Sequence, residues 1–125
     1  MGKALMEAIA KPQNSNLETV RLFTDAGSDV NQKGKEDNTA ILLASKNGNL
    51  KIVKCVVEKG SDVNARDEDD ITALIRASVN GHFEIVKYLV ENGADVNSNT
   101  KDDNTALISA ARLGHAGIVR YLVEK

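Results

Sequence analysis

Large aromatic side chains and cysteine are scarce in this chain of 125 residues. It holds two Phe, two Tyr, one Cys and no Trp. A core without large rings must be filled by Ala, Val, Ile and Leu, which suits close packing of helix on helix. Because Cys55 has no second cysteine to pair with, an intramolecular disulfide is excluded, and the composition favours a reducing compartment.

Net positive charge and long apolar runs are also missing. The formal net charge is −2, so no basic field draws the chain to nucleic acid or to anionic lipid. No apolar run approaches the ~20 residues of a membrane-spanning helix, and residues 1–11 lack the apolar centre of a secretory signal. We therefore expect an intracellular protein, cytoplasmic or nuclear, that binds neither nucleic acid nor membrane.

What the sequence does contain is a repeat of 33 residues. Thr39, Thr72 and Thr105 are separated by 72 − 39 = 105 − 72 = 33 positions. Self-similarity at such a period is the signature of a repeat architecture. The same spacing relates Gly48, Gly81 and Gly114, the Gly-x-Asp-Val-Asn segments 27–31, 60–64 and 93–97, and the Ile-Val pairs 52–53, 85–86 and 118–119.

The third unit shows how each repeat is expected to fold. Thr72 is a good helix N-cap, and residues 73–79 form a short apolar stretch that predicts a first helix. Gly81 can take the left-handed conformation that ends this helix. Residues 82–91 carry apolar side chains at helical spacing and predict a second helix, which Gly93 ends. The polar, turn-rich segment that follows predicts an exposed hairpin loop.

Neither helix is long enough to be stable alone in water, so each pair must bury its apolar face on neighbouring pairs. The pattern, clearest from Gly81-His82 through Asn97, resembles the ankyrin repeat. The resemblance implies an all-α, ankyrin-repeat solenoid of stacked antiparallel helix pairs with projecting β-hairpin loops. It also implies a single ankyrin-repeat domain over 1–125, with units at approximately 1–32, 33–65, 66–98 and 99–125.

The chain departs from the family pattern at two recurrent positions. The usual Thr-Pro-Leu-His segment lacks Pro and His, but Ala at the first helical position is itself a good helix former. The turn glycine two residues before each Thr is replaced by Asp37, Asp70 and Asp103. Asp is among the few residues that tolerate the left-handed region, so we expect the hairpins to survive.

The first unit is divergent and resembles a polar cap. Met6 and Glu7 stand where Thr and Ala should be, Pro12 falls at the end of the predicted first helix, and Ser15 with Glu18 forms a capping box for the second.

The last unit has no such cap, and it stops at Lys125, where the next Gly-Ala-Asp loop would begin. Gly117 also weakens its second helix. We expect a C-terminal repeat that frays or self-associates, and an ending of this kind favours a module cut from a longer ankyrin protein.

Residues with catalytic or metal-binding chemistry show no supporting pattern. His82 and His115 lie 33 residues apart without ligand partners at zinc spacing, so they are interpreted as helix-start residues that bond to a neighbouring loop. Cys55 is interpreted as a small packing residue. The acidic run 67–70 lacks the central Gly and distal Glu of a calcium loop and is interpreted as a solvated hairpin tip. We therefore expect no enzyme activity, no cofactor and no metal.

In the ankyrin family, partners usually lie along a concave groove formed by hairpin tips and first helices. Positions on that surface vary between the units of this chain, while the framework between them repeats. Selection for a protein partner and simple tolerance of an exposed face both explain this variation. The partner-binding positions that the resemblance implies are Lys35, Glu36, Asn38, Leu43, Lys46, Asn47, Glu68, Asp69, Ile71, Arg76, Val79, Asn80, Lys101, Asp102, Asn104, Ser109, Arg112 and Leu113.

Among these positions, Arg76 between Ile71 and Val79 is the best candidate hot spot, because Arg anchors are enriched at interface centres. We expect its replacement by Ala to weaken binding without lowering stability. An engineered or reconstructed ankyrin scaffold with no physiological partner is the alternative, although Gly117 and the irregular first unit argue against pure consensus design. The resemblance also implies that loop asparagines can be hydroxylated, with Asn97 fitting best.

Overall fold

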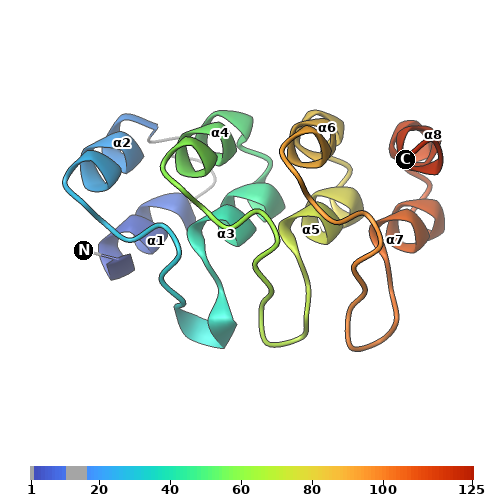
Figure 1. The fold of residues 1–125 in the computed structure, drawn as a ribbon, viewed down its shortest axis with the longest axis horizontal. Helices are drawn as coiled ribbons and strands as arrows, with labels where there is room; N and C mark the ends of the chain where they lie inside the picture. The colour runs from blue at the N-terminus through green and yellow to red at the C-terminus, as the bar shows by residue number, and fades with distance from the viewer. Residues whose placement is uncertain (1, 11–16) are drawn as a thin grey trace.

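The computed structural model describes residues 2–10 and 17–125, and within these ranges the chain folds into eight α-helices and one 3-10 turn. Figure 1 shows the helices in two parallel rows, with the loops projecting to one side. The helices are α1 (Gly2–Ala10), α2 (Leu17–Asp25), α3 (Ala40–Asn47), α4 (Leu50–Glu58), α5 (Ala73–Val79), α6 (Phe83–Glu91), α7 (Ala106–Arg112) and α8 (Ala116–Val123), and the 3-10 turn η1 is Lys35–Asp37.

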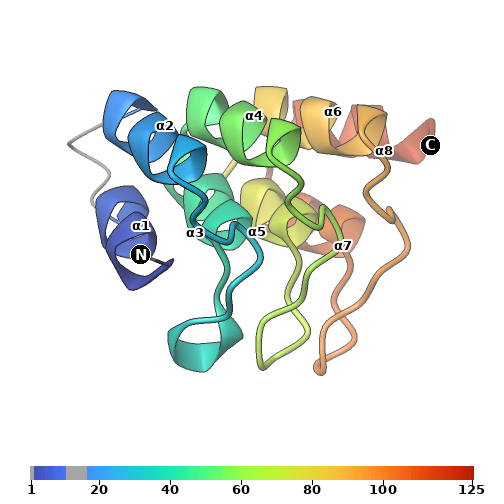
Figure 2. The ribbon, with the colours of Figure 1, turned by 60° about the vertical axis from the view of Figure 1, so that its left-hand side comes forward.

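The odd-numbered helices form one row and the even-numbered helices the other (Figure 1), as an all-α ankyrin solenoid requires. The first helix of each repeat packs on the first helix of the next repeat and on the second helix of its own repeat. Figure 2, turned by 60°, shows the loops leaving the helical layers at a steep angle, so the tips and the odd-numbered helices border a concave side. Among the described helices, none is long and apolar enough to span a membrane.

The third unit folds as its sequence predicts, with small differences at the helix ends. Helix α5 covers Ala73–Val79, and the hydroxyl of Thr72 accepts a hydrogen bond from the Ile75 amide at 3.3 Å. Gly81 ends the turn with φ of +75°. Helix α6 begins at Phe83, one residue later than predicted. Thr105 caps α7 in the same way, whereas Thr39 makes no side-chain cap bond to α3.

The core runs through the whole stack as a layer of aliphatic side chains, without any Phe or Tyr among its fully buried members in the described residues. Leu42, Leu74 and Leu89 are fully buried, and so are Val53 and Val86, which occupy the same position in two successive repeats. Because these residues recur every 33 positions, each repeat offers its neighbour the same apolar surface. This recurrence explains how helices of seven to nine residues become stable.

The first unit deviates from the expected register. Helix α2 ends 33 positions before α4 (58 − 25 = 33), but residues 2–6 already belong to α1, whereas the residues 33 positions later, 35–39, precede α3. The assignment of Met6 and Glu7 to the Thr-Ala cap position was therefore wrong, because both lie in the middle of α1. Met6 instead packs against Gly34, where the methionine Cε leaves no room for a Cβ. Pro12 and the predicted Ser15 cap lie outside the described residues.

The projecting loops are narrow turns with little ladder pairing. Among the described residues, the one β-bridge joins Arg66 and Thr72. Another loop closes through the Thr100 amide, which donates to the Asn104 carbonyl at 2.9 Å. The predicted left-handed aspartates are confirmed, with φ of 60°, 61° and 59° at the three positions 37, 70 and 103.

Candidate binding groove

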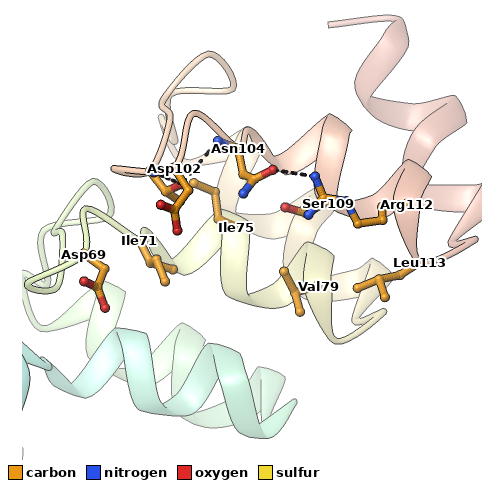
Figure 3. A pocket seen from close by; sticks show the side chains of 10 residues that line it. Asp69, Ile71, Ile75, Val79, Asp102, Asn104, Ser109, Arg112 and Leu113 are labelled. Carbon is orange, nitrogen blue, oxygen red and sulfur yellow. Dashed lines mark hydrogen bonds between the residues drawn. The ribbon is translucent and has the colours of Figure 1, made fainter.

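Eight of the predicted partner-binding residues come together in one pocket of about 370 Å³ on the concave side of the third and fourth repeats. Figure 3 shows their side chains, which come from two hairpin tips and from α5 and α7. The pocket also includes Ile75 and Thr100, which sequence reasoning missed. The predicted residues that line it are Asp69, Ile71, Val79, Asp102, Asn104, Ser109, Arg112 and Leu113.

This pocket has an apolar floor and charged margins. Ile71 and Ile75 lie near the hairpins, while Val79 and Leu113 lie at the far helix ends and are exposed (Figure 3). Arg112 donates a hydrogen bond to Asn104 Oδ1 at 2.9 Å, which holds its guanidinium along α7. The exposed carboxylates at positions 69 and 102 stand on neighbouring tips. The pocket can therefore accept an apolar side chain with a cation on the tip side.

A second pocket of about 620 Å³ lies at the other end of the concave side. It brings together three predicted residues, Lys35, Asn38 and Leu43. Its remaining wall comes from α1 and the loop before η1, with Met6 and Ala10 among the lining residues. The sequence pattern did not predict this wall, because it placed Met6 before the first helix and not within α1. The predicted residues that line neither of these two pockets are Glu36, Lys46, Asn47, Glu68, Arg76, Asn80 and Lys101.

Arg76, the predicted hot spot, is held inside the protein. Its Nη2 donates to Asp67 Oδ2 at 2.7 Å and also to Asn38 Oδ1 of the preceding hairpin. The two charged side chains are only 14% and 7% exposed. Arg76 therefore ties the hairpins of the second and third repeats to α5. A contact of this kind contradicts the expectation that its removal would leave stability unchanged.

The interpretation of the acidic run as a solvated tip was wrong for Asp67, which is buried. Its Oδ1 accepts hydrogen bonds from the amides of Asp69 and Ile71 at 2.8 and 3.0 Å. Burial alone raises the pKa of the Asp67 carboxyl, but the hydrogen bonds from Arg76 and from these amides outweigh it and hold the pKa below its ordinary value. Asp67 therefore remains a carboxylate within the hairpin.

Several other predicted polar residues also make internal hydrogen bonds. The Asn47 side chain donates to the Ile9 carbonyl at 2.8 Å, and the Asn80 side chain donates to the Arg76 carbonyl at 2.8 Å. Ser109 lines the pocket of the third and fourth repeats, but its side chain is buried. These residues position the groove wall, whereas the exposed side chains on it are chiefly at the tips and helix ends.

The two histidines are structural, as predicted, although their partners are helix ends and not loops. His82 Nε2 lies 3.2 Å from the carbonyl of Lys46, and His115 Nε2 lies 3.0 Å from the carbonyl of Val79. Each histidine thus binds the last turn of the first helix in the preceding repeat. Within residues 2–10 and 17–125, no group of three or more potential ligands is placed to hold a metal ion. Cys55 is buried, as its interpretation as a packing residue requires.

A second set of contacts between repeats follows the Gly-x-Asp-Val-Asn segments. Asn31 donates to the Gly60 carbonyl at 2.9 Å and accepts from the Asp62 amide at 2.6 Å. Asn64 repeats this pair of bonds one unit later, with Gly93 at 3.1 Å and Asp95 at 2.8 Å. We call this row of contacts the asparagine ladder. It joins the bases of the loops and fixes the spacing of the tips above them.

Comparison with known families agrees with this architecture. A family model of three ankyrin repeats matches residues 5–100, and a model of a single ankyrin repeat matches residues 102–125. Together the two matches cover nearly the whole chain, including every residue of both pockets except Lys3. No curated protein matches the sequence at a significant level.

Proposed function

Because the chain belongs to the ankyrin repeat family, whose repeats generally mediate protein–protein interactions, we propose that it binds another protein through its concave groove. Ankyrin repeat proteins are typically non-enzymatic interaction modules. Helices pack about 8–10 Å apart, so four repeats present a groove roughly 40 Å long. A groove of that length accommodates a standard interface of about 800 Å² per partner.

The observation that carries the proposal is the pocket between the third and fourth repeats. It combines exposed apolar side chains at Val79 and Leu113 with carboxylates at Asp69 and Asp102 and a guanidinium at Arg112. Apolar side chains clustered at an indentation and rimmed by polar groups are typical of interaction sites. We therefore propose that the anchor of the groove lies here, and not at the internally paired Arg76.

The charges on the margin define the chemistry of the partner. The tip carboxylates favour a Lys or Arg of the partner, and Arg112 at the opposite margin favours a carboxylate. An aliphatic or aromatic side chain between these two groups would fill the apolar floor. The best-fitting partner surface thus carries both signs of charge, with an apolar anchor between them.

A photocrosslinking experiment tests this placement. A photoreactive amino acid at Val79 should capture a specific protein from cell extract, whereas the same amino acid at the end-face residue Leu22 should not. The captured protein is then titrated calorimetrically against the Val79→Glu and Leu22→Glu variants. Both substitutions replace an exposed aliphatic side chain with one negative charge.

Val79→Glu should weaken binding by about 2 kcal/mol, or roughly 30-fold, as expected for a central contact. Leu22→Glu should leave the affinity unchanged. Equal affinity of the two variants would show that the partner does not use this pocket.

A further inference from the structure

The two pockets of the concave side occupy equivalent places in the stack, with Arg76 between them. Leu43, Arg76 and Ser109 hold the same position of three successive repeats (76 − 43 = 109 − 76 = 33). Leu43 lines the pocket of about 620 Å³, which we call the N-terminal pocket. Ser109 lines the pocket of about 370 Å³, which we call the C-terminal pocket. The side chain at this recurrent position therefore borders a pocket in the second and fourth repeats.

In the third repeat the same place is occupied by an ion pair. Asp67 holds the position of Gly34 and Thr100, each of which lines one of the two pockets. The Arg76 and Asp67 side chains lie here 2.7 Å apart and are at most 14% exposed. The concave side is thus divided into two pockets with a paired charge between them.

The dimensions of this surface match a single helix laid along the stack. Figure 1 shows the first helices α1, α3, α5 and α7 in one row, and adjacent members of the row are in contact. The pockets lie on the first two and on the last two of these helices, so their centres are about 16–20 Å apart. Helices α5 and α7 have seven residues each and are therefore about 10 Å long, close to the 10–12 Å diameter of an α-helix.

A helix also suits the hydrogen bonding of the tips better than an extended segment does. The amides of Glu68 and Lys101 already donate to carbonyls of the preceding tips, both at 3.1 Å. An extended segment gains most of its affinity from main-chain bonds to a free edge, whereas a helix satisfies its own backbone groups. Apolar anchors and charges are then the features that select the partner.

The charges of the two pockets are opposite in sum. The charged side chains that line the N-terminal pocket are Lys3, Glu7 and Lys35, and those that line the C-terminal pocket are Asp69, Asp102 and Arg112. All six are exposed. The first set has one more cation than carboxylates and the second has one more carboxylate than cations, wherein the N-terminal pocket favours an acidic neighbour and the C-terminal pocket a basic one.

We propose that the partner enters the groove as one amphipathic helix that fills both pockets, an inference that rests on the proposed function. Its anchors are two apolar side chains 11 or 14 residues apart, because these spacings span about 16–21 Å along a helix and return to within about 40° of the same face. Acidic residues flank the anchor in the N-terminal pocket, and Lys or Arg flanks the anchor in the C-terminal pocket. The Arg76–Asp67 pair lies between the two anchors.

Photocrosslinking from both pockets locates the two ends of the partner segment. Val79 lines the C-terminal pocket and Ala10 lines the N-terminal pocket, and both side chains are exposed. Photoreactive amino acids at these positions should capture the same protein, at sites about 11–14 residues apart in its sequence. Capture at Val79 alone, or at distant sites, would overturn the inference and leave the proposed function standing. No specific capture at Val79 would remove both.

A synthetic peptide of the captured segment then tests the two anchors by calorimetry. Leu43→Ser introduces the residue that the fourth repeat carries at this position and should weaken binding about tenfold. Leu22→Ser, at an exposed position outside the groove, should leave the affinity unchanged. Two residues inserted between the anchors rotate one of them by about 200°. The longer peptide should therefore bind the unaltered chain and Leu43→Ser equally weakly, and a peptide that tolerates the insertion would refute a continuous helix.

A matched pair of charge reversals tests the polarity. Lys35→Glu should weaken binding of the same peptide about fivefold, and the loss should shrink as the salt concentration rises. Lys33→Glu makes the same change two residues earlier at an exposed position that lines neither pocket, so its effect should be small. Circular dichroism verifies that both variants fold. Equal affinities of the two variants would overturn the assigned polarity.

Discussion

Replacing Arg76 with Ala should destabilise the protein by about 3 kcal/mol. The change removes two hydrogen bonds from Arg76 Nη2, one to Asp67 Oδ2 at 2.7 Å and one to Asn38 Oδ1. Hydrogen bonds to charged groups contribute about 1.5–3 kcal/mol, and breaking a fully buried ion pair costs about 3–5 kcal/mol. Because the Arg76 and Asp67 side chains are 14% and 7% exposed, the low end of the second range applies.

Urea denaturation followed by circular dichroism measures the loss, with Arg112→Ala as the control. Arg112 is exposed and bonds to Asn104, so its removal should change the free energy of unfolding by no more than about 0.5 kcal/mol. A double-mutant cycle of Arg76→Ala with Asp67→Ala isolates the coupling between the two charges. A loss below about 0.5 kcal/mol for Arg76→Ala, with no coupling, would refute the claim that this pair is desolvated.

The pH dependence gives an independent check. Since the folded pKa of Asp67 is below its ordinary value, its carboxylate stabilises the fold above the unfolded pKa of about 3.9. That stabilisation is lost as the pH falls through the folded pKa. The unaltered chain and the Asp67→Asn variant should therefore differ at pH 7 and converge in acid. A difference that persists unchanged at pH 2 would show that the charge of Asp67 is not the source.

Two further matched pairs test the contacts between repeats. In urea denaturation, Gly81→Ala should lower the free energy of unfolding by about 1 kcal/mol or more beyond the loss caused by Gly114→Ala. Both glycines have positive φ, but an added Cβ at Gly81 would lie 2.8 Å from His115, whereas nothing lies within 4 Å of one at Gly114. Equal losses would show that the histidine moves aside freely. Asn64→Ala should lower the free energy of unfolding by about 1–2 kcal/mol, because it removes two ladder bonds. Asn97→Ala removes no such bond and should change the free energy of unfolding very little. A comparable loss at Asn97 would contradict the assignment of the ladder.

The 33-residue spacing was enough to predict the architecture, because every regular unit carries its own start and stop signals. Thr72, Gly81 and Gly93 act within a few residues of their own positions, so their effects can be inferred locally. The shift of α1 could not be inferred in this way. It depends on how Leu5 and Ile9 pack into the core beside α3, and periodic spacing says nothing about that packing.

The sequence predicted which positions form the groove, but not which of their side chains are exposed and which are paired inside the protein. Arg76 stands where an exposed side chain is expected, yet Asp67 nine residues earlier and Asn38 in another repeat draw it inward. Asp67 occupies the position of Gly34 and Thr100, so no recurrent pattern signals the ion pair. An Asp followed nine residues later by an Arg, in one unit alone, was the available signal. Its meaning depends on a hairpin that brings the two side chains together.

Neighbouring hairpin tips are joined through their backbones, because the Glu68 amide donates to the Glu36 carbonyl and the Lys101 amide donates to the Asp69 carbonyl, both at 3.1 Å. Main-chain bonds of this kind persist whatever side chains the tips carry. Conformational entropy is therefore lost when the chain folds, and little of it remains to be lost when a partner binds. Tip side chains can then be exchanged without reshaping the loops, which leaves this surface open to new specificities by substitution alone.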